Sequence, residues 1–266
     1  MNGRSSMVVL VSVLLLMTVF PAIAYAESTE PQPTPAGAPV AYVQPTESVS
    51  GPITCPAGSV TTAEGHYHWL GAGSSTDIVV VYAEMQVTNP SVPHGGNHFY
   101  ASRIMVKNDA GTVWTEVGWA ELGWKEDKQY VYVWDTNDRL WHLFGQYPIS
   151  SGTWITVKIR YAGPSYPGKW EPMLLWGGSW VVLDRPYMGW EQAPAVEQTG
   201  EIYTPNDVDF AIQQTYFRNV KVQKLGQTLV NWDTTSMPDT TSRPEVQDRY
   251  RLYFDNRWYY WHIWYV

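Results

Sequence analysis

From His66 onward the chain is built of short runs rich in Val, Ile, Tyr, Trp and Thr, separated by Gly, Pro, Asn and Asp. Such runs with turn residues between them are typical of an all-β sandwich, whereas an α/β protein would alternate them with amphipathic helices. Convincing helical periodicity is absent along the whole chain. We therefore predict an all-β fold. The candidate strands lie near residues 77–87, 98–107, 112–120, 129–135, 140–147, 153–162, 171–184, 207–217 and 219–224.

The N-terminus has the parts of a secretory signal peptide. Arg4 lies in a short polar start, residues 7–20 form an almost unbroken apolar run, and residues 24–26 have the small-x-small sequence of a cleavage site. The apolar run is shorter than the ~20 residues that a membrane-spanning helix needs, although an uncleaved anchor remains the alternative. We predict a signal peptide at 1–26, an extracellular protein, and no stable membrane span after cleavage.

The rest of the chain divides by composition. Residues 27–56 are rich in Pro, Thr, Ser, Ala and Gly, which predicts a disordered linker or a short propeptide. We assign the β-sandwich domain to 57–240, and to 241–266 an aromatic C-terminal segment docked on that domain. The single cysteine, Cys55, has no partner for a disulfide within the chain; a half-buried thiol and an intermolecular disulfide are the two interpretations.

Charge and motifs exclude several classes of function. The chain has 17 Lys and Arg against 25 Asp and Glu, a net charge of −8, so no cationic face is expected to bind nucleic acid. No Gly-x-Ser-x-Gly elbow is present, and the only cysteine lies in the linker, which disfavours serine and cysteine hydrolases. His66 and His68 would share a strand face, with His94 and His98 nearby, but the spacing of a metal site is missing. We therefore predict no metal and no cofactor.

Strand alternation locates a candidate groove. In the segment 129–135 the aromatic residues lie on one face and the valines on the other, because successive side chains of a strand point to opposite faces. In 112–119, Trp114, Glu116 and Gly118 share a face, and Gly118 would leave room for a ligand. Two such strands side by side would form an aromatic-lined groove containing one carboxylate. In the alternative interpretation, the aromatic rings pack under a long loop and Glu116 is solvated.

The spacing of the acids decides between kinds of carboxylate chemistry. Jelly-roll glycosidases place their acids at even offsets on one strand face, whereas Glu116 and Glu121 differ by five and would point to opposite faces. Glu197 and Glu201 differ by four and would share a face. This pattern weakens the interpretation as a retaining glycosidase and leaves Glu116 and the Glu197–Glu201 run as the acids to consider.

The order of these motifs resembles a known family. Glu116-Val117-Gly118-Trp119 is followed by the aromatic strand 130–134, the segment 152–157, Trp170, the segment 176–180, the run from Glu197 to Glu201, and Phe210. Over about residues 66–225 this resembles the glutamic peptidases, meaning the eqolisins and the neprosin-like proteins. Eqolisins have Gln at the first site, in a Gln-x-Gly strand, and neprosin-like proteins have Glu there. The resemblance implies a concanavalin-like antiparallel β-sandwich of the jelly-roll type.

The resemblance also implies a function. It assigns Glu116 to the first catalytic position and Glu201 to the second, in a secreted acid-active endopeptidase, a hydrolase that cleaves an extended polypeptide. Two carboxyls in a partly desolvated groove would share a proton, so one acts as general base toward water and the other donates to the oxyanion. The residues expected to bind the substrate are Trp114, Gly118, Tyr130, Tyr132, Trp134 and Glu197.

A second hypothesis comes from the aromatic composition. The chain has 15 Trp and 18 Tyr but only 6 Phe, and rings with a polar edge suit surfaces as well as cores. A noncatalytic carbohydrate-binding or cell-surface adhesion module, with a polysaccharide as its partner, would explain the Trp-rich C-terminal strand without any pairing of Glu116 with Glu201. The separation of these two carboxyls distinguishes the hypotheses, because only the peptidase needs them together.

Overall fold

The computed structural model describes residues 60–266 apart from 63–64, 126, 206–208 and 245. The predicted signal peptide at 1–26, the linker at 27–56 and Cys55 lie outside the described residues. The described residues form strands, turns and irregular segments and contain no helix. None of them therefore belongs to a helix long and apolar enough to cross a membrane.

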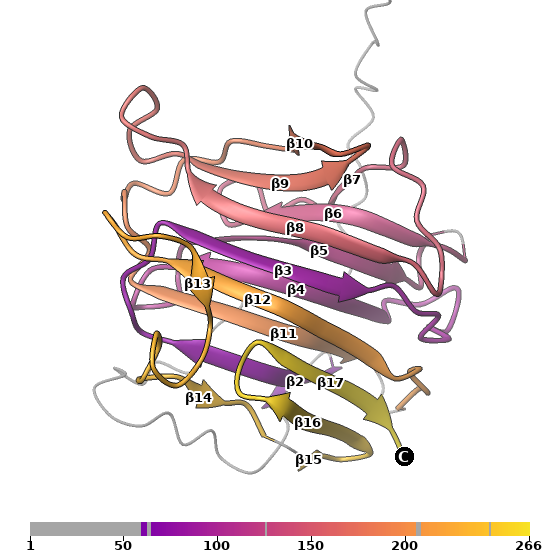
Figure 1. The fold of residues 1–266 in the computed structure, drawn as a ribbon. Helices are drawn as coiled ribbons and strands as arrows, with labels where there is room; N and C mark the ends of the chain where they lie inside the picture. The colour runs from indigo at the N-terminus through magenta and orange to yellow at the C-terminus, as the bar shows by residue number, and fades with distance from the viewer. Residues whose placement is uncertain (1–59, 63–64, 126, 206–208, 245) are drawn as a thin grey trace, which may run out of the picture. The chain divides into compact units, whose positions relative to one another are not determined.

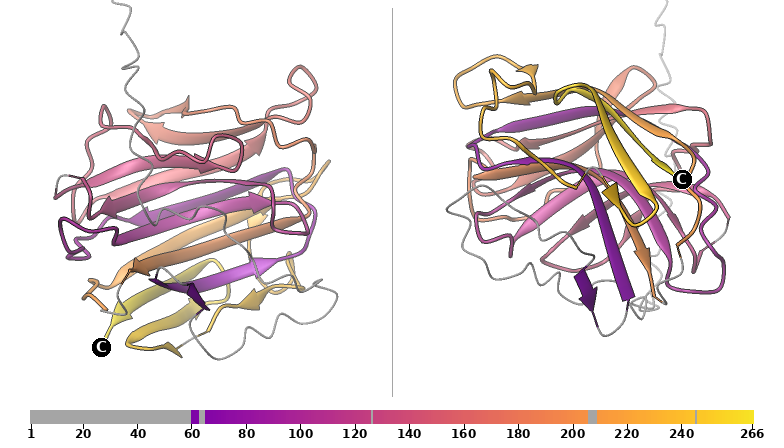
Figure 2. Two further views of the ribbon diagram at one scale, coloured as in Figure 1. Left: turned by 180° about the vertical axis from the view of Figure 1, so that it is seen from behind. Right: turned by 90° about the horizontal axis from the view of Figure 1, so that it is seen from below.

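Two antiparallel sheets pack face to face, and the second lies in front of the first in Figure 1. The first sheet has the order β1 (Val60–Thr62), β2 (Gly65–Ser74), β11 (Ala195–Thr204), β4 (Phe99–Lys107), β5 (Trp114–Leu122), β6 (Gln129–Asp135) and β7 (His142–Leu143), with β14 (Thr241–Ser242) paired to β2. The second has the order β10 (Ser179–Val182), β9 (Trp170–Trp176), β8 (Trp154–Tyr161), β3 (Val80–Gln86), β12 (Thr215–Gln223), β17 (Tyr260–Tyr265), β16 (Tyr250–Asn256) and β15 (Val246–Gln247), with β13 (Val230–Asn231) paired to β12. This architecture confirms the predicted all-β antiparallel sandwich, and Figure 2 shows its layers from behind and from below.

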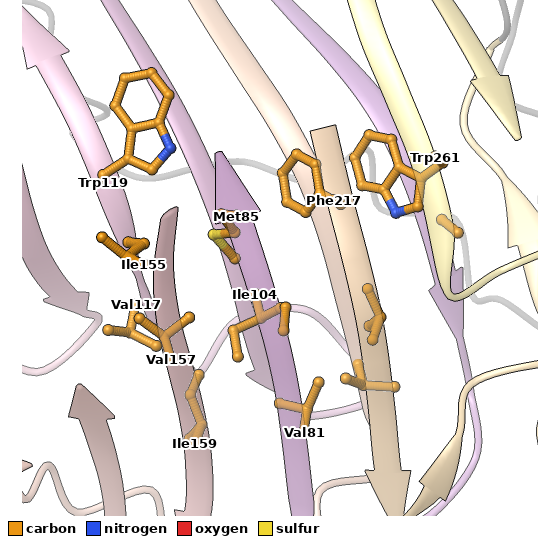
Figure 3. Packing of buried hydrophobic residues seen from close by; sticks show 14 of the residues in the cluster. Val81, Met85, Ile104, Val117, Trp119, Ile155, Val157, Ile159, Phe217 and Trp261 are labelled. Carbon is orange, nitrogen blue, oxygen red and sulfur yellow. The ribbon is translucent and has the colours of Figure 1, made fainter. Parts of the chain in front are cut away.

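Strand alternation builds the core between the sheets. Val131 and Val133 of β6 are fully buried there, as the alternation in 129–135 predicts. Figure 3 shows Ile104, Val117 and Trp119 of the first sheet meeting aliphatic side chains of β3 and β8 in the second. Burying these side chains contributes roughly 1.5–3 kcal/mol each, so the core supplies the main driving force for folding.

Two strands, one in each sheet, differ from the sequence-based expectation. The predicted strand at 207–217 is wrong, because residues 209–214 are irregular and β12 begins at Thr215. β11, which was treated only as an acidic cluster, is instead a central strand buried on both faces. Strands buried on both faces lack the apolar–polar alternation of surface strands. β11 also contains buried polar residues, among them Glu197 and Glu201, which pair with basic side chains.

The predicted run 171–184 is a hairpin rather than one strand. Gly177 and Gly178 connect β9 to β10 with φ of 57° and 80°, a left-handed backbone that suits glycine. The two strands pair in register across this turn, with Ser179 opposite Trp176.

The aromatic segment at 241–266 supplies strands to both sheets. β14 pairs with β2 of the first sheet, and β15, β16 and β17 extend the second sheet beyond β12. Trp261 of β17 is fully buried, and its ring stacks on that of Phe217 with 3.9 Å between centroids (Figure 3). The indole Nε1 of Trp261 donates to Oε1 of Gln198 in β11 at 2.5 Å, so this residue links the two sheets.

We expect Trp261→Ala to lower the free energy of unfolding by about 3–5 kcal/mol, the usual cost of emptying a large aromatic site in a core. Equilibrium urea denaturation measures the loss as a lower midpoint at unchanged slope. Trp264→Ala is the matched control, because Trp264 lies half-buried on the outer face of the same strand, and it should cost about 1 kcal/mol or less. Equal losses in the two variants would contradict a core role for Trp261.

Candidate active site

The outer face of the first sheet carries a second layer of buried aromatic residues. Phe99 packs against Trp124 and Trp141, with 6.3 Å and 5.2 Å between ring centroids. Trp124 lies between β5 and β6, and Trp141 between β6 and β7, so these connections lie over the sheet. Tyr132 is completely buried beneath Trp141, with 4.8 Å between their rings. The aromatic face expected at 130–134 is therefore largely covered rather than open to solvent.

The register of β11, β4 and β5 brings the two predicted catalytic glutamates together. Glu201 pairs with Ala101 of β4, and Glu116 pairs with Met105 on the other side of the same strand. Ala101 and Met105 lie two residues before and after Arg103, so they share its face of β4. Both carboxyls therefore lie diagonally across from the guanidinium of Arg103.

Arg103 makes the central contacts of the site. Its Nε donates to Oε2 of Glu201 at 2.8 Å, and its Nη1 lies 3.0 Å from Oε2 of Glu116. The hydroxyl of Tyr132 donates to Oε1 of Glu116 at 3.2 Å. Arg103, Glu116 and Glu201 are only 2%, 7% and 6% exposed. The two glutamates thus share one buried cation, which the sequence analysis did not anticipate.

The sequence holds a signal that identifies Arg103. It lies at the middle of the predicted strand 98–107. All the other residues from Phe99 to Val106 are apolar or small. An arginine in such a strand has to be paired when it is buried, because an unpaired buried charge is very costly. A search for acids on the neighbouring strands would have led to Glu116 and Glu201.

Burial and neighbouring charges shift the pKa values of Glu116 and Arg103. It raises the pKa of Glu116 to about 7; the nearby charge of Arg103 opposes this effect, and that of Glu201 adds to it. Burial alone would lower the pKa of Arg103, but the charges of Glu116 and Glu201 raise it well above its ordinary value. Below about pH 7, therefore, Glu116 carries a proton next to a guanidinium that stays charged.

A pocket lies over these three charged side chains. Its walls are Phe99, Met105, Trp114, Trp134 and Trp141, and Arg103, Glu116 and Glu201 complete its lining. Trp114 and Trp134 stack with 4.8 Å between ring centroids, across the strand pair β5 and β6. Two of the expected substrate-binding residues, Trp114 and Trp134, thus border the space in front of the carboxyls. Phe99, Met105 and Trp141 were not anticipated.

The other expected substrate-binding residues lie differently. Tyr132 supports Glu116 from below, and Tyr130 lies outside this lining, with Nζ of Lys128 4.9 Å from its ring centroid. A β carbon added to Gly118 would lie 1.8 Å from the carbonyl oxygen of Ser102. The space left by Gly118 is therefore taken by the backbone of β4 and not by a ligand, which corrects that expectation.

Glu197 forms a separate buried ion cluster. Its Oε1 binds both Nζ of Lys107 and Nη2 of Arg243, and the carboxyl lies outside the pocket lining. Burial would raise the pKa of Glu197, but the charges of Arg243 and Lys107 outweigh it and hold that pKa well below its usual range. Because Arg243 directly follows β14, this cluster ties the β14 segment to β11 and β4. These contacts give Glu197 a structural role.

Glu121 lies on the opposite face from Glu116, as their spacing predicts. Its Oε1 accepts the backbone N–H of Val92 at 3.1 Å, and its Oε2 accepts a bond from Gln129 at 2.5 Å. Glu121 is 1% exposed and is therefore a satisfied structural carboxyl.

Two clusters have ligand atoms close enough together for a metal ion. One is His68, Asp209 and Asp248, and the other is Asp135, Asp138 and His142. Among the histidines singled out from the sequence, only His68 belongs to such a cluster within the described part of the chain. Its Nε2 lies 3.4 Å from Asp209 and its Nδ1 lies 3.2 Å from Asp248, so the carboxylates flank the ring from two sides.

Comparison with known proteins gives a likeness of fold. No family model matches the sequence, and no curated protein matches it. Among solved structures, the chain is similar to scytalido-glutamic peptidase with a transition state analog inhibitor, at 14% identity and a TM-score of 0.52, over 77% of this chain and 100% of that one. A second structure of scytalido-glutamic peptidase, with a peptide based transition state analog, matches at 15% identity and a TM-score of 0.49, over the same shares. SCP-B, a member of the eqolisin family, in complex with the tripeptide Ala-Ile-His, matches at 14% identity and a TM-score of 0.46, again over 77% and 100%.

The fold predicted from the motif resemblance is therefore confirmed as glutamic-peptidase-like. At 14% identity the likeness to scytalido-glutamic peptidase concerns the β-sandwich itself. The roles of Glu116, Glu201 and the pocket residues remain predictions.

We expect Glu197→Gln to lower the free energy of unfolding by about 3–5 kcal/mol at pH 7, because Lys107 and Arg243 lose their buried anion. The pKa of Glu197 is depressed in the folded state, so its stabilisation is present above the unfolded value of about 4.3 and is lost as pH falls below it. The difference between wild type and variant should therefore shrink below about pH 4.5. Urea denaturation from pH 7 to pH 2 measures it.

Glu84→Gln is the control for that experiment. Glu84 accepts a bond from Arg218 at 2.7 Å, but the side chain of Arg218 is 45% exposed, so solvent screens the pair. Its loss should cost less than about 1 kcal/mol at pH 7. A difference for Glu197→Gln that is small, or independent of pH, would argue against a stabilising buried cluster.

Proposed function

We propose that this chain is a secreted glutamic-type endopeptidase that cleaves extended polypeptides at the site formed by Arg103, Glu116 and Glu201. The observation that carries the proposal is that both glutamates contact one buried guanidinium beneath one pocket. A noncatalytic carbohydrate-binding or adhesion module would not need two glutamates in contact with one buried cation. The glutamic-peptidase-like fold supports the same conclusion. Glu rather than Gln at position 116 is the form expected of neprosin-like proteins, and the signal peptide predicted at 1–26 is the basis for proposing secretion.

The two glutamates have different tasks in the proposed reaction. Glu116, protonated below about pH 7, donates its proton to the carbonyl oxygen of the scissile bond and to the oxyanion that develops there. Its Oε1 accepts a hydrogen bond from Tyr132 and its Oε2 pairs with Arg103, which leaves a lone pair on each oxygen for the proton. Glu201 is then the general base that takes a proton from the attacking water. The water adds to the carbonyl carbon, and the C–N bond then breaks as the proton on Glu201 passes to the leaving amine. One hydroxyl proton of the intermediate returns to Glu116 as the new carboxyl group forms.

The pH dependence follows from Glu116. Its pKa is raised to about 7, so its proton is present at acid pH and is lost as pH rises through 7. Peptidase activity should therefore be high in acid and decline near neutrality. The pocket walls of Trp114, Trp134 and Trp141 border the donor and would hold the chain of the substrate against it.

We expect Glu201→Gln to lower kcat/KM by about 10²–10⁴-fold at pH 5, because the general base is lost. Glu116→Gln should retain part of the activity, because an amide N–H still donates to the oxyanion, and its activity should no longer decline near pH 7. Cleavage of casein or a denatured peptide library from pH 3 to 8 measures both effects. Serine, cysteine and metal-directed inhibitors should have no effect.

Glu121→Gln is the matched control, because Glu121 is buried in the same strand as Glu116 but faces away from the pocket. Its pH profile should match that of the wild type. Cleavage that persists in Glu201→Gln would rule out the proposed role of Glu201. An inactive wild type across the whole pH range would reject the peptidase itself.

A second candidate function, carbohydrate binding, rests on a row of aromatic rings on the outer face of the second sheet. His262 of β17 pairs with Tyr253 of β16 and with Tyr216 of β12, and their rings lie 5.5 Å and 4.9 Å from that of His262. Trp264 lies 5.2 Å from His262 along the same strand. Sugar rings stack on such aromatic surfaces, and this row explains the aromatic C-terminal strand, which the peptidase site does not use.

If this surface binds a polysaccharide, the double substitution Tyr253→Ala and Trp264→Ala should weaken binding about tenfold, or about 1.4 kcal/mol. Affinity electrophoresis in gels containing neutral or acidic polysaccharides measures the retardation. Tyr187→Ala is the control, because Tyr187 is 61% exposed and outside the row. No retardation of the wild type by any polysaccharide would remove this candidate.

A further inference from the structure

The guanidinium of Arg103 occupies the centre of the site without facing open solvent. Arg103 is 2% exposed, and its two carboxylate contacts run in opposite directions across β4: a hydrogen bond to Glu201 of β11 and an ion pair with Glu116 of β5. Its Nη1 also lies 3.1 Å from the sulfur of Met105, a pocket residue. A buried arginine with two carboxylate partners is held far more rigidly than an exposed one, because each charge-assisted bond fixes its planar fork.

We propose that Arg103 is the positioning residue of this site: it holds Glu116 and Glu201 at fixed places on either side of β4, and its charge acts on the Glu116 carboxyl. This proposal rests on the proposed peptidase function. It adds a third residue to the two that the motif resemblance assigns. Arg103 acts through the glutamates and is given no contact with the scissile bond.

The groups that face this centre come from three other strands. Glu116 of β5, Tyr132 of β6 and Glu201 and Glu197 of β11 all act on the charge of Arg103. The nearest further cation on β4 is Lys107, which together with Arg243 is engaged by Glu197. Arg103 is therefore the cation that contacts Glu116, and its loss is not compensated by a neighbour already in reach.

The effect of the charge of Arg103 and the positioning by its guanidinium can be separated by substitution. The charge of Arg103 opposes the effect of burial on Glu116, so a neutral residue there should let Glu116 keep its proton to higher pH. The fork of Arg103 places two donors at once, which a lysine ammonium on a flexible stem cannot reproduce in the same geometry. A lysine should therefore restore the charge effect but not the positioning of Glu201.

The test compares Arg103→Met and Arg103→Lys with the wild type by two measurements. Titration of the Glu116 carboxyl carbon by NMR reports its proton directly and needs no activity. The pH profile of kcat/KM on a peptide substrate reports the working range. We expect Arg103→Met to move the Glu116 titration and the alkaline limb of the profile upward by about 1–3 pH units, the usual effect of a contacting opposite charge. Arg103→Lys should keep both near the wild-type pH while kcat falls at least about tenfold, as expected when a reacting group is misplaced.

Lys107→Met is the matched control, because Lys107 is also a buried cation of β4 bonded to a glutamate of β11 but is outside the pocket lining. It should shift the Glu116 titration by less than half the shift seen in Arg103→Met. Unchanged titration in Arg103→Met, or an equal shift in Lys107→Met, would overturn the proposal. If Arg103→Met does not fold, Arg103→Lys decides: full activity there would show that the fork positions nothing. An inactive wild type would reject the peptidase, while the NMR titration still tests the influence of Arg103 on Glu116.

Discussion

The contact of one buried guanidinium with two carboxyls is the constraint on which the site depends. A charge as deeply buried as that of Arg103 is tolerated only when its donors are paired, and its partners come from the strands on both sides of its own. The same contact that satisfies Arg103 therefore fixes the relative position of Glu116 and Glu201. The acids proposed to carry out hydrolysis are thus also the acids that neutralise the buried guanidinium in the folded state.

The two faces of the first sheet have different roles. One face of β4, β5 and β11 contributes Ile104, Val117 and Ile202 to the core, and the other carries the charged site beneath its aromatic cover. A slip of one residue in the pairing of β11 would move Glu201 into the core and an apolar residue into the site. The register is thus specified twice, by apolar burial on one side and by ion pairing on the other, which makes alternative pairings of this strand costly.

Sequence reasoning reached much of this arrangement. The fold class followed from turn spacing, and the faces of Val131, Val133, Glu116 and Glu121 followed from alternation, because a period of two is a strong local signal. The centre of the site was missed, because Arg103 is surrounded in sequence by apolar residues and its partners lie on other strands. β11 was not recognised as a strand because its buried acids resemble a surface segment. Pairing between strands distant in sequence supplied what local pattern could not.

The place of Trp261 in the core has a consequence for how the chain acquires its structure. The ring packs between Phe217 of the second sheet and Gln198 of the first, so this part of the core is complete only when residues near 261 have joined it. The central strand β11 likewise pairs with β2, more than a hundred residues earlier in the chain. Contacts this distant in sequence make folding slow, because the entropy of closing long loops is lost before the stabilising contacts form. The sandwich therefore forms only after segments far apart in the sequence have been brought together.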